Sequence, residues 1–169
     1  MIELTQSRLQ ELLHYNRETG DFTWLPTRSR TAKAGAVAGT LSTKAGYRYI
    51  RVGGKAYLAH RLAFFYMTGA WPVHQMDHYN GIRDDNRWGN LREATNAENQ
   101  QNQAMHSNNT SGFMGVSWHR QTEKWRAQIK VAGRRKSLGL FTTPESAHAA
   151  YLTAKAEHHP FQPHLRSKE

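Results

Sequence analysis

Cysteine is absent from this sequence of 169 residues, which excludes disulfide bonds, thiolate metal sites and cysteine nucleophiles. A chain without cysteine suits a reducing compartment, so we expect an intracellular, cytoplasmic protein. Long apolar runs are absent as well, because no stretch approaches the roughly 18 apolar residues of a membrane span. The first residues carry neither a basic leader nor an apolar core, and we expect a soluble protein without a signal peptide.

Acidic residues are scarce, since 13 Asp and Glu stand against 23 Lys and Arg and leave a net charge of +10. Residues 1–55 hold 9 basic and 4 acidic residues, residues 56–111 hold 4 and 5, and residues 112–160 hold 8 and 3. Basic side chains gain affinity for a polyanion by releasing counterions, although charge alone does not choose between nucleic acid and an anionic membrane. Together with the aromatic and arginine content, this pattern favours basic flanks that hold a nucleic acid while the neutral middle acts on it.

Short helices and hairpins are expected to alternate in the first half of the chain. Leu9, Leu12 and Leu13 recur at helical spacing behind a Thr5 or Ser7 cap. The expected elements are a helix over 4–14, two strands around a glycine turn in 15–25, an irregular loop over 26–46, a hairpin around Gly53 and Gly54, and a helix that ends at Gly69.

The C-terminal part has the pattern of a sheet covered by one helix. Three strand-like runs, "GVSWHR", "KWRAQIKV" and "RKSLGLF", precede a helix with Thr143 as its cap and Pro144 at its first position. Alternation in these runs leaves one face apolar and the other polar. The residues expected on the polar face are Ser117, His119, Lys124, Arg126, Gln128, Lys130, Arg135 and Ser137.

No carboxylate lies among the residues of this polar face. The set therefore favours contact with DNA phosphates and base edges. The alternative is a solvated sheet face without a partner, and for any single lysine that remains the better interpretation.

The stretch "GVSWHRQTEKWRAQIKVAGRRKSLGLFTTPESAHAAY" resembles the APETALA-two/ethylene-response-factor (ERF) DNA-binding domain, over residues 111–160. The resemblance rests on the Gly-Val opening, the aromatic-Ala-x-Ile strand, the Leu-Gly-x-Phe strand end and the Ala-Ala-Tyr helix. It implies a three-stranded sheet that packs on one helix and enters the DNA major groove with its exposed face. The family's DNA-contacting positions fall on Ser117, Gln128, Lys130, Arg135 and Ser137. Ser117 and Ser137 depart from the family's pattern, so its recognition sequence does not transfer.

In the middle of the chain, "MDHYNGIRDDNRWGN" places Asp77 directly before His78. A carboxylate can bind a hard divalent ion and an imidazole can take a proton near neutral pH, so the pair suits metal-assisted hydrolysis. Mg²⁺ keeps several waters, so one carboxylate and one amide oxygen form a sensible ligand set. A helix is expected over residues 91–103, and one of its faces would carry the amides of Asn96, Asn99 and Asn102.

Each of these residues also has a structural interpretation. An isolated Asp-His pair is common and usually carries no function. Asn80 before a glycine fits a turn, and Asn86 and Asn90 fit residues that organise a loop. His74 and His78 have a spacing that could bind zinc, although no cysteine or second His pair completes such a site.

"LAHRLAFFYMTGAWP" followed by "MDHYNGIRDDNRWGNLREATNAENQQN" resembles the HNH endonuclease family, in the form common among phage-type and free-standing homing endonucleases. "YNRETGDFTW" resembles the N-terminal region that accompanies this subgroup, so the resemblance covers most of residues 12–103. It implies a small ββα-metal module with the Asp-His pair on the first strand, then a loop, a second strand and a helix. Aligned on "DH", "NLR" and "EN", it makes Asp77 and Asn99 metal ligands, His78 the general base and Asn90 the residue that orients the His78 loop.

One geometric condition follows for the pair. Adjacent residues on a flat strand face opposite ways, so Asp77 and His78 can serve one site only if the chain bends or the substrate passes between them. Nearby, His60 and Arg61 could touch DNA phosphates, although a buried structural role for His60 fits equally well.

The sequence thus predicts an α+β protein in which a small ββα-metal (HNH) nuclease module precedes a three-stranded antiparallel sheet packed on one helix. The predicted segments are an accessory helix and hairpin region at 1–46, the nuclease module at 47–103, a linker at 104–110, the DNA-binding domain at 111–160 and a tail at 161–169.

The resemblance implies a metal-dependent endonuclease that hydrolyses phosphodiester bonds in double-stranded DNA and leaves 5′-phosphate and 3′-hydroxyl ends. The expected cofactor is Mg²⁺, with Mn²⁺ as the alternative. We expect no association with a membrane and no obligate protein partner. The protein is expected to be either a monomer, which would cut one DNA strand, or a homodimer. The main alternative is a DNA-binding regulator with a decayed nuclease fold, and an RNA-directed nuclease is a third. The expected DNA contacts come from Ser117, His119, Arg126, Gln128, Lys130, Arg135 and Ser137.

Overall fold

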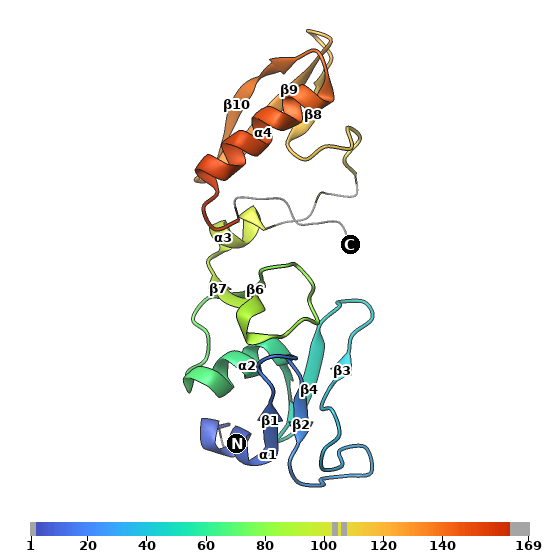
Figure 1. Ribbon diagram of the computed structural model, residues 1–169, viewed down its shortest axis with the longest axis vertical. Coiled ribbons are helices and arrows are strands. Elements are labelled where there is room, and N and C mark those ends of the chain that lie inside the picture. The colour runs from blue at the N-terminus through green and yellow to red at the C-terminus, as the bar shows by residue number, and fades with distance from the viewer. Residues whose placement is uncertain (1–2, 103–104, 106–107, 163–169) are drawn as a thin grey trace. The chain divides into compact units, whose positions relative to one another are not determined.

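The computed structural model describes residues 3–102, 105 and 108–162. The chain forms two compact units, Met1–Ala94 and Thr95–Glu169. Figure 1 labels their helices and strands. This division into two units does not test the five segments predicted from the sequence, which stay predictions.

The first unit begins with helix α1 (Gln6–Leu12), which starts where the Thr5 side chain accepts a hydrogen bond from Arg8 N at 3.2 Å. The predicted helix over 4–14 is therefore placed correctly but is too long. Leu13 already belongs to strand β1 (Leu13–Tyr15), because it pairs with Trp24 of strand β2 (Phe22–Trp24). Helix and strand both direct leucines inward, so the apolar pattern alone did not separate them.

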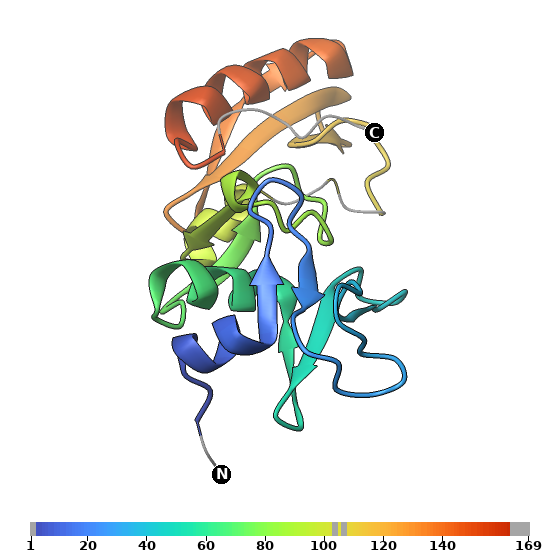
Figure 2. The same ribbon diagram turned by 60° about the horizontal axis from the view of Figure 1, so that its bottom comes forward.

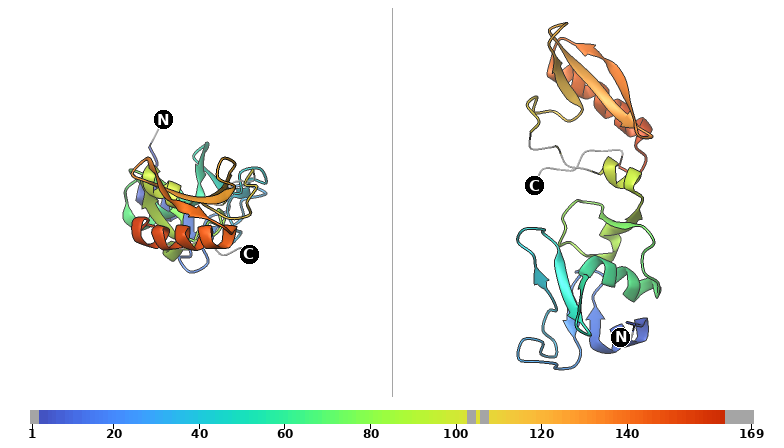
Figure 3. Two further views of the ribbon diagram at one scale, coloured as in Figure 1. Left: turned by 90° about the horizontal axis from the view of Figure 1, so that it is seen from above. Right: turned by 180° about the vertical axis from the view of Figure 1, so that it is seen from behind.

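A three-stranded antiparallel sheet follows, in the order β3 (Thr40–Leu41), β4 (Arg48–Val52) and β5 (Lys55–Leu58). Gly53 and Gly54 join β4 to β5 with φ angles of 58° and 84°, a turn that requires positive φ at both positions. The predicted hairpin is thus confirmed. Helix α2 (Ala59–Thr68) packs on β4 and β5 and ends at Gly69, as predicted; Figure 3 shows it beside these strands.

Strands β6 (Gln75–His78) and β7 (Leu91–Ala94) form an antiparallel pair, and the 3-10 helix η1 (Trp88–Asn90) leads into β7. The predicted helix over 91–103 is wrong in its first part, because residues 91–94 pair with β6. Helix α3 (Asn96–Gln101) begins only after its N-cap residue Thr95, whose side chain and that of Glu98 form a reciprocal capping box. The order strand, loop, strand, helix agrees with a ββα module.

The second unit contains a sheet of three antiparallel strands, β8 (Val116–His119), β9 (Lys124–Val131) and β10 (Arg134–Phe141), with β9 in the centre. Helix α4 (Pro144–His158) runs along one face of this sheet, as Figure 2 shows. Thr143 caps α4 by accepting from Ser146 N at 3.2 Å. Ala147 and Ala127 are fully buried between helix and sheet, so the predicted sheet with one helix is confirmed.

Helix α3 belongs to this second unit and is held there at its C-terminal end. The buried Lys155 of α4 donates from Nζ to Gln101 O at 2.8 Å. Lys130 of β9 donates from Nζ to Gln100 Oε1 at 3.0 Å.

None of the helices in the described ranges is long and apolar enough to cross a membrane.

Candidate active site

Asp77 and His78 end strand β6, and both side chains are buried, at 5% and 4% exposure. Pairing with β7 sets Asp77 opposite Arg92 and His78 opposite Leu91. The chain turns directly after the strand, where Gly81 N donates to His78 O at 2.8 Å. A bend thus begins at His78, which is one of the two conditions under which neighbouring residues can serve one site.

The Asp77 carboxylate forms an ion pair with the guanidinium of Arg92. Its Oδ2 accepts from Arg92 Nε at 3.0 Å and from Arg92 Nη2 at 2.9 Å. The same guanidinium lies over the Tyr79 ring, 4.8 Å from its centre. Arg92 therefore fixes the orientation of Asp77, a role that the sequence did not indicate because it depends on the register between β6 and β7.

The His78 imidazole contacts Asn86 of the following loop, with 3.3 Å between Nε2 and Asn86 Oδ1. The Asn86 amide donates from Nδ2 to Asp84 O at 3.1 Å, which leaves its Oδ1 to accept from His78. In a neutral imidazole Nε2 then carries the hydrogen and Nδ1 the lone pair. Burial lowers the pKa of His78 from its usual value, while the hydrogen bond with Asn86 and the charge of Asp77 oppose the shift. His78 is thus held in the form that can accept a proton.

His60 of α2 packs directly on His78, with ring centres 5.0 Å apart and the rings nearly perpendicular. Its side chain is buried and therefore cannot contact DNA phosphates in this conformation. Burial, with smaller contributions from His78 and Arg61, lowers the pKa of His60 from 6.5 to about 3. His60 is therefore a neutral packing partner of the candidate base.

Acid should destabilise the fold through His60. The unfolded imidazole protonates near pH 6.5 while the folded one stays neutral to about pH 3, so stability present above pH 6.5 is lost as pH falls. Where the unfolded state binds one proton more than the folded state, the free energy of unfolding falls by about 1.4 kcal/mol for each pH unit of acidification. His60→Gln should therefore show a shallower loss between about pH 7 and pH 5 in urea unfolding than the wild type. His14→Gln, at an exposed histidine of β1, serves as the control, and equal slopes in wild type and His60→Gln would contradict the prediction.

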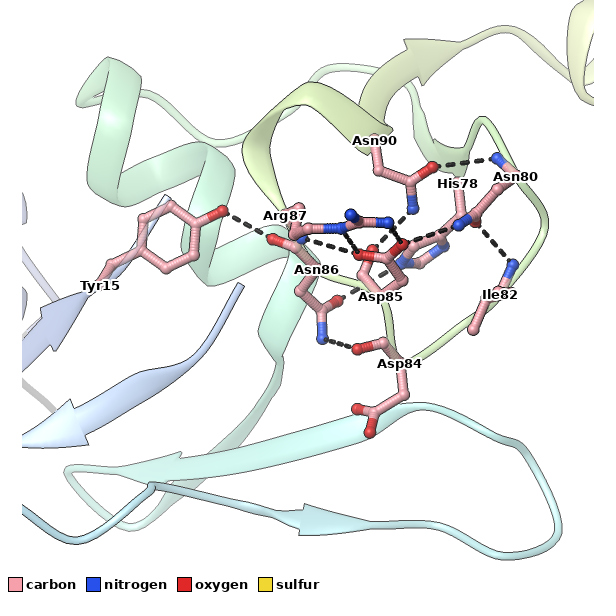
Figure 4. A network of polar contacts seen from close by, with 9 residues as sticks. All are labelled: Tyr15, His78, Asn80, Ile82, Asp84, Asp85, Asn86, Arg87 and Asn90. Atoms are coloured by element: carbon pink, nitrogen blue, oxygen red, sulfur yellow. Dashed lines mark hydrogen bonds and ion pairs between the residues drawn. The ribbon is translucent and has the colours of Figure 1, made fainter. Parts of the chain in front are cut away.

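A network of polar contacts braces the loop between His78 and β7 (Figure 4). Asn90 is buried; its Oδ1 accepts from Asn80 N at 3.0 Å and its Nδ2 donates to Asp85 O at 2.7 Å. Asn80 forms the predicted turn by accepting from Ile82 N at 2.9 Å. The structure thus gives Asn90 contacts with the start and the middle of the loop, while its role in catalysis stays a prediction. The sequence placed Asn86 among the loop organisers and did not indicate its contact with His78.

The N-terminal hairpin supports the same loop. The buried Tyr15 of β1 donates from its hydroxyl to Asn86 O at 2.6 Å, as Figure 4 shows. Trp88 N donates to Arg17 O at 3.0 Å. At Gly20, with φ of 81°, an added Cβ would lie 2.4 Å from the Asn86 carbonyl carbon, so only glycine allows this approach. The region predicted as an accessory is therefore packed against the segment that carries His78.

The residues fit a hard divalent ion better than zinc. Among the described residues, no group of three or more His, Asp or Glu side chains is placed to hold a metal ion of any kind. The zinc interpretation of His74 and His78 therefore gains no support, and a hard-ion site at Asp77 would need an amide ligand as well. Asp77 offers a buried carboxylate, whose oxygens suit Mg²⁺. Asn99, the second predicted ligand, lies on α3, where its N donates to Thr95 O at 2.9 Å. Its role as a ligand stays a prediction.

The predicted DNA-contacting residues share one face of the β8–β9–β10 sheet. Register places Ser117 opposite Arg126 and His119 opposite Lys124. On the other side of β9, the facing pairs are Arg135 with Lys130 and Ser137 with Gln128.

Two donors of this face lack a protein partner. Within the described residues, Ser117 Oγ and Arg126 Nε are buried without a hydrogen bond. Unsatisfied donors on neighbouring strands are costly unless a ligand or water binds them.

Comparison with known proteins matches the same region. A family model described as HNH endonuclease matches residues 57–101, which run from β5 through α2, β6 and β7 to the end of α3. Protein 3.8 of Escherichia phage T7 is 30% identical to this chain over 86 residues, which cover 51% of this chain and 71% of that protein. No solved structure matches the chain.

Proposed function

This chain belongs to the HNH endonuclease family, and we propose that it hydrolyses phosphodiester bonds in duplex DNA with a divalent metal ion as cofactor. The observation that carries the proposal is the buried Asp77-His78 strand within the matched residues 57–101. Both side chains have partners that fix them, Arg92 for Asp77 and Asn86 for His78. These contacts hold both side chains in fixed orientations, as a reaction at this pair requires.

In the proposed reaction His78 removes a proton from the attacking water at the ring nitrogen that does not face Asn86. Asn86 keeps the imidazole in the required tautomer, and Asn90 holds the loop that follows His78 and carries Asn86. Asp77 and Asn99 are proposed to hold the metal ion, with Arg92 orienting the Asp77 carboxylate. The ion, when bound, supplies positive charge that stabilises the departing 3′ oxygen. Mg²⁺ is the proposed ion because the ligands are oxygens, and Mn²⁺ is the alternative.

The experiment that tests this function follows supercoiled plasmid through incubation with the protein and Mg²⁺. We expect relaxed or linear DNA, and no product when EDTA removes the metal. Retardation of the plasmid on a gel without cleavage, across Mg²⁺, Mn²⁺ and several DNA substrates, would instead support the non-enzymatic DNA-binding regulator. Cleavage of RNA but not DNA would support the RNA-directed nuclease.

The polar face of the second unit is proposed to position the nuclease on duplex DNA, in the manner implied by its resemblance to the APETALA-two/ERF domain. The chemistry of the face supports this role, since none of its proposed contacts is a carboxylate and its cations and amide suit phosphates and base edges. The proposed contacts are Ser117, His119, Arg126, Gln128, Lys130, Arg135 and Ser137.

Neighbouring arginines of β10 provide a matched test of this face. Arg135 pairs with Lys130 and shares the polar face, whereas Arg134 pairs with Val131 and points to the other side. Both are exposed. Arg135→Gln should reduce the slope of log affinity against log salt for duplex DNA by about 1, because one phosphate contact is lost. Arg134→Gln removes the same charge and should leave the slope near that of the wild type; equal slopes for both variants would contradict the assignment.

A further inference from the structure

The first unit carries a basic surface that the proposed reaction does not use. Residues 22–76 contain eight Lys and Arg residues and no Asp or Glu. Within the described residues, the side chains of Arg30, Lys33 and Arg51 form no hydrogen bond or ion pair, and all three are exposed. By contrast, Arg8 pairs with Glu11 elsewhere in this unit. Repulsion among unpaired like charges costs stability, which an anionic partner would offset.

One of these cations, Arg51, lines a groove on the outer face of the β3–β4–β5 sheet. Ile50 and Val52 of β4 are buried, so the alternating Tyr49 and Arg51 point away from the core. Ala56 pairs with Arg51 and thus shares this face. No acidic side chain is among the described residues that line the groove, which include Trp24, Thr31, Val37, Thr40, Tyr49 and Arg51.

The loop that follows β2 forms the second wall and brings further charge. Thr31 of this loop lines the groove; Arg30 directly precedes it in the sequence, and Lys33 follows two residues later. The small residues Gly39 and Ala56 also line the groove. Val37 is 53% exposed, which leaves an apolar side chain for contact with sugar rings.

We propose that this groove binds the phosphate backbone of duplex DNA and is a contact surface in addition to the candidate active site. The proposal rests on the proposed nuclease function, which supplies the DNA. Arg51, Arg30 and Lys33 neutralise phosphates, while Tyr49 and Val37 pack against the sugars.

Two ties connect the sheet that bears the groove to the His78 loop within the first unit. Arg48 of β4 donates to both carboxylate oxygens of Asp84, at 3.0 and 2.8 Å. Arg83 donates from Nη1 to Ala45 O at 2.9 Å, in the turn between β3 and β4. A duplex held in the groove is therefore held at a fixed position relative to the loop that follows His78. The surface orients the substrate and takes no part in the chemistry.

The test compares Arg51→Gln with Arg8→Gln in the full chain. Both variants remove one positive charge from an exposed site of the first unit, but Arg8 lies on α1 beside Glu11 and outside the groove. Affinity for a labelled duplex of random sequence is measured by fluorescence anisotropy in EDTA over a range of salt concentrations. Arg51→Gln should lower the slope of log affinity against log salt by about 1, and the double variant Arg30→Gln/Lys33→Gln by about 2. Arg8→Gln should leave the slope near the wild-type value.

The outcomes separate this surface from the nuclease function. Because EDTA prevents cleavage, a reduced slope in Arg51→Gln supports the groove even if the wild type fails to cut plasmid in Mg²⁺. Wild-type slopes in both Arg51→Gln and Arg30→Gln/Lys33→Gln overturn the groove even if the wild type cuts. Tighter wild-type binding of RNA, of polyglutamate or of anionic vesicles than of duplex DNA, lost in Arg51→Gln, would assign the groove to another partner and overturn the proposal.

Discussion

His78→Ala should lower the rate of plasmid cleavage by about 100- to 10,000-fold, the range that general base catalysis contributes. The buried imidazole is kept from protonation by its surroundings and is oriented by Asn86, so no neighbouring side chain of similar basicity can replace it in the same position. His60 is the nearest ring, but its pKa of about 3 makes it a poor proton acceptor. The measurement is the initial rate of supercoiled plasmid loss at saturating Mg²⁺.

Three controls make this result specific. His74→Ala changes an exposed histidine four residues earlier and should cleave at nearly the wild-type rate. His78→Gln keeps a polar side chain of similar size, so it distinguishes loss of the base from a cavity beside His60. Thermal unfolding and duplex binding in EDTA should show that both His78 variants remain folded and bind DNA. A folded His78→Gln with wild-type cleavage would remove His78 from the mechanism.

The sequence predicted the elements whose pattern is local. Alternation along β9 placed its polar residues on one face, and the register of β8 and β10 puts the other predicted contacts on that face. The Gly53-Gly54 turn and the Gly69 stop were equally predictable, because positive φ at these positions favours glycine. The Asp77-His78 pair was visible only as a pair, and family resemblance supplied its role.

Contacts that depend on tertiary structure were not predictable. Residues 91–94 contain helix-forming residues, yet they form β7 because pairing with β6 outweighs their local preference. The contacts of Arg92 with Asp77 and of Asn86 with His78 arise from that register and from the fold of the loop. The support from Tyr15 crosses 71 positions of the sequence, so no short pattern could indicate it. The sequence identified Asp77 and His78 as candidate reacting groups, and the fold shows which residues hold them.

Asn99→Ala should reduce cleavage by at least about 100-fold, because it would remove a proposed ligand of the ion that stabilises transition-state charge. Asn96→Ala should cost far less. Both asparagines belong to the short helix α3, at its first and fourth residues, and both replacements favour a helix, so their effects on α3 itself are matched. Helix α3 begins at the Thr95 capping box, which neither variant touches.

The dependence on Mg²⁺ separates a ligand from a residue that only supports the helix. If Asn99 holds the ion, the Mg²⁺ concentration for half-maximal cleavage should rise in Asn99→Ala and stay unchanged in Asn96→Ala. Asn99→Asp retains an oxygen at the same place and should recover part of the rate, since Mg²⁺ accepts either a carboxylate or an amide oxygen. Duplex binding in EDTA should remain near the wild-type value in all three variants, because the proposed contacts on the β8–β9–β10 sheet are unaltered. Equal losses in Asn99→Ala and Asn96→Ala, with an unchanged Mg²⁺ requirement, would show that α3 supports the fold and that the second ligand of Asp77's ion lies elsewhere.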